Sequence, residues 1–174
     1  MERLVIIPTY NEKENVEAII TAVMNLPLEF HVLIIDDGSP DGTADIVKRL
    51  MKGTYKDRLF IIERSGKLGL GTAYITGFKW AIEHHYDYVF EMDADFSHNP
   101  NDLLKLYEAC ADGGADVAIG SRYVSGVNVV NWPMGRVLMS YFASKYVRFV
   151  LGVNIHDTTA GFKCYRRQVL ETIE

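Results

Sequence analysis

The sequence predicts a three-layer α/β domain in which helices cover both faces of a mostly parallel central sheet. Two observations lead to this fold class. Strand-like runs of β-branched and aromatic residues alternate along the chain with helical patterns, at a spacing typical of parallel strands joined by helices. The chain also has 174 residues, of which 48% are hydrophobic, so it is long and apolar enough to bury one sizeable core.

Five runs are predicted to be strands because each is rich in β-branched or aromatic residues and is bounded by polar turn residues. They cover residues 3–7, 31–36, 59–63, 87–92 and 116–120. In a parallel sheet the ligand crevice lies beyond the carboxyl ends of the strands. We therefore expect the residues that follow these strands to form the functional site.

Four helices are predicted between these strands. In the first, Asn11 is expected to act as the cap, Glu14 takes the third position, and an apolar face continues until the chain approaches Pro27. The other three are expected from Asp41 or Thr43 to Leu50, at about 72–85, and at 100–111.

A longer helix is predicted from Pro133 to Val150, where apolar residues occupy much of the helix surface and basic residues lie among them. Two interpretations fit this pattern. The helix lies against a membrane interface, or it packs on the sheet.

Composition excludes several classes of protein. A net charge of -5 argues against binding nucleic acid or anionic membranes through bulk charge.

Cys110 and Cys164 fit no metal or redox spacing and are interpreted as reduced thiols of a cytosolic protein. No signal-peptide layout opens the chain, and no stretch reaches the roughly 18 uninterrupted apolar residues of a spanning helix. A cytoplasmic location is expected, with any membrane contact peripheral.

Two carboxylates, those of Asp93 and Asp95, directly follow the fourth predicted strand. Side chains alternate along an extended chain, so both carboxylates point the same way and repel each other unless a cation or basic groups neutralise them. Hard divalent cations prefer such oxygen ligands. The triplet with Ala94 indicates a metal site or, like many isolated acidic triplets, a solvated loop.

Polar residues follow each of the five predicted strands. These stretches are Pro8–Glu12, Asp36–Ser39, Arg64–Lys67, Asp93–Asp95 and Ser121–Tyr123. Loops are polar in general because they face water, but this does not account for carboxylates at two strand ends. A single site built from all five strand ends is the economical interpretation.

Six stretches resemble, in the same order, the motifs of the family 2 glycosyltransferases of the GT-A fold, and among them the dolichyl- or polyprenyl-phosphate mannose synthases. The stretches are Ile7–Glu12, Asp36–Thr43, Lys67–Tyr74, Met92–His98, Ser121–Tyr123 and Asp157–Phe162. The glycine-rich third stretch and the Ser97-His98 pair are the most specific. The resemblance implies a GT-A fold, with a Rossmann-like nucleotide-sugar-binding domain.

The resemblance also implies a role for each matching residue. The implied guanosine pocket comprises Pro8, Tyr10, Glu12, Ile35 and Asp37, and Lys67 is a candidate clamp over the nucleotide sugar. The implied metal and diphosphate segment comprises Asp93, Ala94, Asp95 and Ser97. Arg122 and Arg136 match arginines that hold the acceptor phosphate and the transferring group, which makes them candidate catalytic residues together with Asp95.

The reaction implied by the resemblance is inverting transfer of mannose from GDP-mannose to a polyprenyl (dolichyl-type) monophosphate, giving a β-linked product. Mg²⁺ or Mn²⁺ is the implied cofactor, and the implied location is peripheral, at the cytoplasmic face of a membrane. Two alternatives stay open. One is a UDP-glucose polyprenyl-phosphate glucosyltransferase, and the other is a nucleotide- and metal-binding module without turnover.

Members of this family continue beyond an aromatic and basic run that corresponds here to Phe162–Arg167, whereas this chain stops at Glu174 inside an expected helix. No capping glycine ends that helix. We therefore expect residues 1–174 to form a single GT-A domain that is truncated at its C-terminus.

Overall fold

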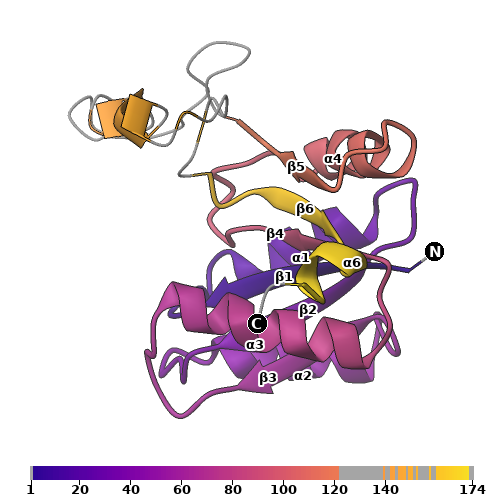
Figure 1. Ribbon diagram of the computed structural model, residues 1–174. Helices are drawn as coiled ribbons and strands as arrows, with labels where there is room; N and C mark the ends of the chain where they lie inside the picture. Colours follow the sequence, from indigo (N-terminus) through magenta and orange to yellow (C-terminus); the bar gives the residue numbers. More distant parts are fainter. Residues whose placement is uncertain are drawn as a thin grey trace.

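The computed structural model describes residues 2–121, 139, 142–143, 145–147, 149–150, 152, 157 and 160–172 (Figure 1). Within these residues a six-stranded sheet has the order β3-β2-β1-β4-β6-β5. The strands are β1 (Arg3–Thr9), β2 (His31–Asp36), β3 (Leu59–Glu63), β4 (Tyr88–Glu91), β5 (Val117–Ile119) and β6 (Lys163–Arg166). The first four strands pair in parallel, and β6 is antiparallel to both β4 and β5.

Helices cover both faces of this sheet, which confirms the predicted three-layer α/β class (Figure 1). The helices are α1 (Val16–Met24), α2 (Thr43–Lys52), α3 (Leu70–Glu83), α4 (Asp102–Ala111) and α6 (Arg167–Leu170). One core cluster joins α1, α2 and α4 to the sheet, and a second joins α3 and α6 to its other face.

The central strand β1 contributes to both cores. Val5 and Ile7 belong to the cluster under α1, α2 and α4, whereas Leu4 and Ile6 belong to the cluster under α3. A parallel strand that is buried on both faces has a continuous apolar sequence instead of an alternating one. This explains why a run of aliphatic residues, and not an alternating pattern, marks β1.

The strand β6 was not predicted. It is four residues long and contains two basic residues, so its local sequence resembles a loop. Both cations have partners in the fold: Lys163 Nζ lies 2.9 Å from the Glu91 carboxylate on β4, and the Arg166 guanidinium donates to the backbone carbonyl of Cys110. The helix expected from Arg167 onward is present as the short α6, followed by a turn.

The predicted cap of the first helix is wrong. Asn11 has a left-handed backbone with φ of 60°, and α1 begins only at Val16, with Asn15 at its N-cap. The carbonyl of Glu12 accepts hydrogen bonds from the N–H groups of Asn15 and Val16, so a turn separates Asn11 from the helix. Asn11 therefore shapes the loop after β1.

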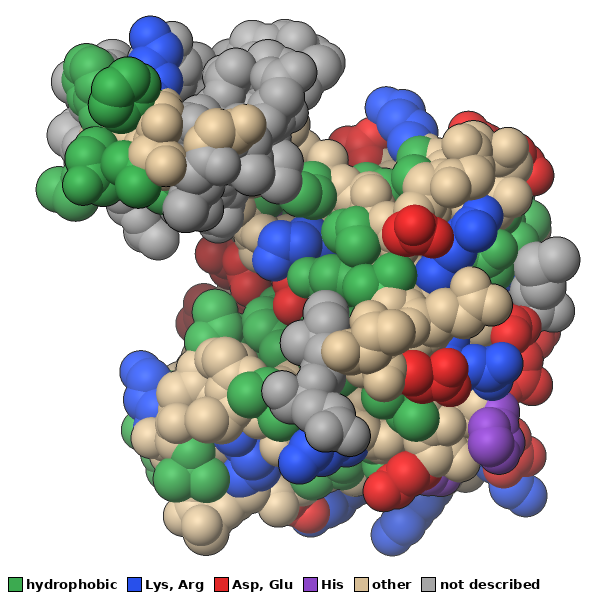
Figure 2. Space-filling view, viewed as in Figure 1, with side chains coloured by type: hydrophobic (Ala, Val, Ile, Leu, Met, Phe, Trp, Pro, Cys, Tyr) green, Lys and Arg blue, Asp and Glu red, His purple; other side chains and the backbone are tan. Residues whose placement is uncertain are grey.

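The segment predicted as a long helix is only partly described. The described residues from 139 to 150 have helical backbone, and several apolar side chains among them are exposed, with Phe149 at 88%. Figure 2 shows these hydrophobic side chains grouped at the upper left, beside a basic one. Among the described residues, no helix combines the length and apolar character that crossing a bilayer requires.

Candidate nucleotide-sugar site

A cleft of about 240 Å³ opens at the carboxyl ends of β1 and β4. Its lining residues are Pro8, Thr9, Tyr10, Glu12, Asp37, Lys67, Gly69, Leu70, Ala73, Asp93, Ala94 and Asp95. The strand order reverses between β1 and β4, because β2 and β3 follow β1 on one side and β4 lies on the other. In open α/β sheets, ligands bind at such a switch point.

Eight of the residues that the resemblance implicated lie together in this cleft. They are Pro8, Tyr10, Glu12, Asp37, Lys67, Asp93, Ala94 and Asp95. The structure does not bring Ile35 into the cleft, because its side chain is fully buried in the core under α3. Ser97 lines a neighbouring cavity instead, and Arg122 and Arg136 lie outside the described residues.

The loop after β1 is fixed by side chains from the loop after β2. Backbone N–H groups of residues 11, 12 and 13 donate in turn to Ser39 Oγ at 2.9 Å, Thr43 Oγ1 at 3.1 Å and Asp41 Oδ2 at 3.1 Å. Short polar side chains suit this task because they reach nearby backbone groups. The stretch Asp36–Thr43 therefore fixes the position of the loop that contains Tyr10.

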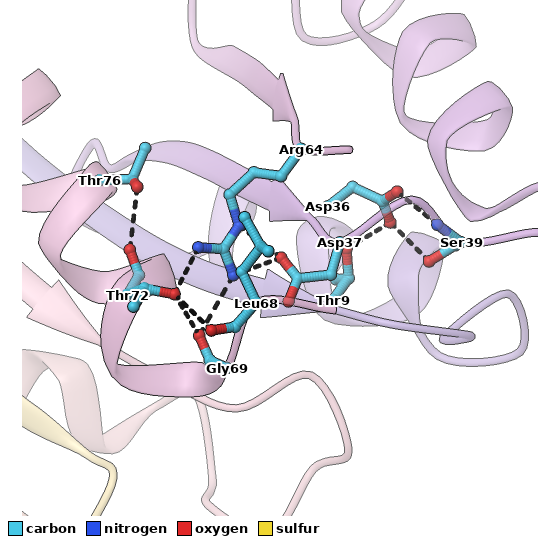
Figure 3. Close-up of polar contacts among 9 residues, drawn as sticks. All are labelled: Thr9, Asp36, Asp37, Ser39, Arg64, Leu68, Gly69, Thr72 and Thr76. Carbon is cyan, nitrogen blue, oxygen red and sulfur yellow. Dashed lines mark hydrogen bonds and ion pairs between the residues drawn. The ribbon is translucent and has the colours of Figure 1, made fainter. Parts of the chain in front are cut away.

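Asp36 and Asp37 are adjacent but have different surroundings (Figure 3). Asp36 is 1% exposed, and its carboxylate accepts hydrogen bonds from the hydroxyl of Thr9 and from both the N–H and the hydroxyl of Ser39. Its bonds are internal to the loops. Asp37 points the other way, toward the cleft, where it meets Arg64.

Arg64, which opens the third polar stretch but was given no role of its own, connects Asp37 to α3 (Figure 3). Its Nε donates to Asp37 Oδ1 at 2.6 Å, its Nη1 to the Thr72 hydroxyl at 2.7 Å, and its Nη2 to the Gly69 carbonyl at 3.2 Å. The fixed fork of guanidinium donors allows this threefold contact. Its position at the end of a strand next to β2 was the available signal.

Lys67 lies over the ring of Tyr10, with its Nζ 4.7 Å from the ring centroid. The two residues come from the loops after β3 and β1 and both line the cleft. An ammonium group over an aromatic face is a favourable cation–π contact. A positive charge therefore lies in the same cleft as the carboxylates of Asp93 and Asp95. Such a charge suits the binding of nucleotide phosphates.

The carboxylates of the acidic triplet differ in exposure. Asp95 is exposed and accepts the N–H of Ser97 at 2.9 Å, whereas Asp93 is half-buried and lies 3.5 Å from the Tyr74 hydroxyl. Burial, together with the negative charges of Asp93 and Glu91, raises the pKa of Tyr74 well above its usual value. The Tyr74 hydroxyl therefore keeps its proton at neutral pH and can donate a hydrogen bond.

These two carboxylates suit a divalent cation that binds together with a diphosphate. In the described part of the chain, no cluster of three or more acidic, histidine or cysteine side chains could hold a metal by itself. Mg²⁺ and Mn²⁺ commonly take one or two carboxylates and complete their shell with water and substrate phosphates. The donor set of the cleft therefore fits a cation that depends on the bound nucleotide.

A second cavity, of about 970 Å³, adjoins the triplet. It begins at Phe96 and Ser97, runs along the start of α4, and reaches Ser121 at the end of β5. Phe96 has a left-handed backbone with φ of 56°, which turns the chain from the cleft to this cavity. A second molecule could therefore approach Asp95 from the side opposite α3.

Comparison with known proteins identifies the family. Residues 4–174 match the family model described as glycosyl transferase family 2. The chain belongs to this family. It is 50% identical, over 98% of its length, to polyprenol monophosphomannose synthase of Mycolicibacterium smegmatis, and 43% identical, over its whole length, to undecaprenyl-phosphate mannosyltransferase of Micrococcus luteus. It spans 64% and 70% of these curated relatives.

Solved structures with the same fold belong to other glycosyltransferases. The mannosyltransferase PcManGT from Pyrobaculum calidifontis, in complex with GDP-Man and Mn²⁺, has a TM-score of 0.68 at 21% identity, over 98% of this chain and 46% of that one. Glucosyl-3-phosphoglycerate synthase from Mycobacterium tuberculosis, in complex with Mn²⁺ and UDP, has a TM-score of 0.69 at 17% identity, over 97% and 57%. The family 2 chain thus has the predicted GT-A fold.

Proposed function

We propose that this family 2 chain transfers mannose from GDP-mannose to a polyprenyl monophosphate, with inversion to a β-linked polyprenyl-phosphate mannose. The observation that carries the proposal is the cleft at the β1/β4 switch point, which gathers eight of the residues implicated in donor binding. Two relatives, 50% and 43% identical, are named for mannosyl transfer to polyprenyl or undecaprenyl phosphate. The proposal treats residues 1–174 as a single glycosyltransferase domain.

In this proposal the nucleoside lies between the loops after β1 and β2. The ring of Tyr10 offers an apolar face to the base or ribose, and the carboxylates of Glu12 and Asp37 accept hydrogen bonds from base N–H groups. Arg64 holds Asp37 in position for this contact. On binding, the phosphates replace the Tyr10 ring as the partner of the Lys67 ammonium.

Asp95 and Asp93 would hold Mg²⁺ or Mn²⁺, with Ser97 as a further candidate ligand. A bound cation supplies Lewis-acid stabilisation of the negative charge that develops on the departing nucleoside diphosphate. The acceptor needs no strong general base, because the second ionisation of a phosphate monoester lies near pH 6, roughly one unit below neutrality. The site must therefore bind and orient two anions and keep them from repelling each other.

Arg122 and Arg136 are the proposed partners of the acceptor phosphate, since a guanidinium binds phosphate through two parallel hydrogen bonds. The acceptor would enter through the cavity beside Asp95, which is lined in part by Ser121, the residue before Arg122. Its lipid chain places the reaction at a membrane surface. The exposed apolar side chains between residues 139 and 150 support peripheral contact at the cytoplasmic face.

Radiolabelled donors test this function. Incubation with GDP-[¹⁴C]mannose, polyprenyl phosphate and Mn²⁺ should give label in the organic phase, EDTA should abolish it, and restored Mn²⁺ should recover it. Label from UDP-[¹⁴C]glucose but not from GDP-mannose would contradict the proposed mannosyl transfer and favour the glucosyltransferase alternative. GDP and Mn²⁺ binding without labelled lipid from either donor would leave a binding module and contradict the proposal.

A further inference from the structure

Asp93 is held from two sides, and its neighbours come from segments that are distant in sequence. The Tyr74 hydroxyl on α3 lies 3.5 Å from its Oδ1. On the other side, the backbone of Gly161 approaches so closely that a Cβ at this position would lie 3.1 Å from Oδ2. The carboxylate therefore occupies a narrow slot between a helix and the segment that leads into β6.

The position of the Tyr74 hydroxyl is fixed by the core. Tyr74 is buried, and its ring stacks on Phe78 one turn further along α3, with 6.2 Å between the ring centroids. The same helix packs tightly on the sheet at Gly77, where no side chain would fit beside Ile6. Helix packing, and not a flexible loop, determines where the hydroxyl points.

A second carboxylate near the Tyr74 hydroxyl, that of Glu91 at the end of β4, is already paired. Glu91 lies two residues before Asp93, and its carboxylate binds Lys163 Nζ at 2.9 Å while only 8% of its side chain is exposed. A paired carboxylate is a weaker competitor for the tyrosine hydroxyl. The hydrogen bond from Tyr74 is therefore available to Asp93.

We propose that Tyr74 is a positioning residue whose hydroxyl orients the Asp93 carboxylate toward the cation that binds with the nucleotide. The inference rests on the proposed function, since it needs a cation in the cleft. Hydrogen bonds to a ligating carboxylate fix its rotamer and tune its basicity, and their loss commonly lowers metal affinity by about tenfold to a hundredfold. Because 3.5 Å is long for such a bond, we expect the effect to lie at or below the low end of this range.

The test compares Tyr74→Phe with Tyr86→Phe. Tyr86 is also a buried tyrosine of the same core cluster, but its hydroxyl contacts His31 Nδ1, at 2.7 Å, and not the cleft. Calorimetry measures the affinity for Mn²⁺ with GDP present and the affinity for GDP without metal. Thermal unfolding checks that each of the two variants is folded. Tyr74→Phe should weaken Mn²⁺ binding about threefold to tenfold, and Tyr86→Phe should leave it unchanged.

Gly161→Ala is the second variant, because its methyl group would press on Asp93 Oδ2 without removing the tyrosine. It should weaken Mn²⁺ binding in the same way. Wild-type Mn²⁺ affinity in Tyr74→Phe, or an equal loss of GDP affinity without metal, would overturn the inference while the proposed function stands. Failure of the wild-type chain to bind Mn²⁺ and GDP at all would reject the site itself.

Discussion

The acidic residues around the cleft divide into those that hold the loops together and those that face the cleft. The Asp36 carboxylate accepts hydrogen bonds from Thr9 and Ser39, whereas Asp37 faces the cleft. Asp36 is the last residue of β2, and Asp37 points to the opposite side, as adjacent residues of an extended chain do. Asp93 and Asp95 both line the cleft, although they follow the end of β4 and Asp95 lies in a turn.

Replacing Arg64 should cost far more stability than replacing an exposed arginine. The side chains of Arg64 and Asp37 are 8% and 9% exposed, so Arg64→Met leaves a buried carboxylate without its partner. The free energy of unfolding should fall by roughly 3 kcal/mol in urea titrations. Arg49→Met is the matched control, because Arg49 and Glu17 are 64% and 53% exposed. It should lose at most about 1 kcal/mol, and equal losses would contradict this account.

At the scale of single residues, the sequence pointed to side chains that line the cleft better than to the side chains that support them. Acidic and aromatic residues at strand ends, read together with the resemblance, pointed to the residues that line the cleft. The importance of Arg64 depends on the side-by-side pairing of β2 and β3, which the local sequence does not encode. Ile35 matches a family position, but its side chain faces the core, and a match by position does not reveal that.

Among the helices, α3 connects the cleft most directly with the core. Its first turn receives Arg64, its second turn carries Tyr74, and Gly77 brings it against the sheet. A Cβ at Gly77 would lie 2.7 Å from Ile6 Cγ2, closer than packed atoms come. The glycine is therefore explained by close packing of α3 on β1.

Two substitutions in α3 separate close packing from helix propensity. Gly77→Ala should lower the free energy of unfolding by about 1–3 kcal/mol, because the helix must shift away from Ile6. Gly71→Ala meets no atom within 4 Å and should be neutral or stabilising by up to about 1 kcal/mol. Urea denaturation of the two variants measures the difference. A Gly77→Ala variant as stable as Gly71→Ala would show that the helix is not confined here.

At the scale of elements, the main strands and helices could be predicted because each has its own apolar pattern. The strand β6 could not, because antiparallel pairing of Lys163 with Glu91 joins residues that are far apart in sequence. The start of α1 was missed for a similar reason. Side chains from the loop after β2 hold the turn before it, so the cap-like Asn11 is drawn into a loop.

For the molecule as a whole, the strand order sets the location of the site. The chain places β1 beside β4 in the middle of the sheet, so loops that are about half the chain apart meet at one edge. Alternation of strands and helices predicted that edge, but not which two strands flank the cleft. The neighbouring cavity at the end of β5 extends the same edge of the sheet.

The central claim is that the cleft between β1 and β4 binds a nucleoside diphosphate together with a divalent cation. Isothermal titration of GDP into the chain, with and without Mn²⁺, tests it most directly when wild type is compared with Asp95→Asn. Wild type should bind GDP more tightly with Mn²⁺, and Asp95→Asn should lose about tenfold or more of the Mn²⁺-dependent affinity. Wild type that fails to bind GDP with Mn²⁺, or Asp95→Asn that binds as well as wild type, would contradict the claim.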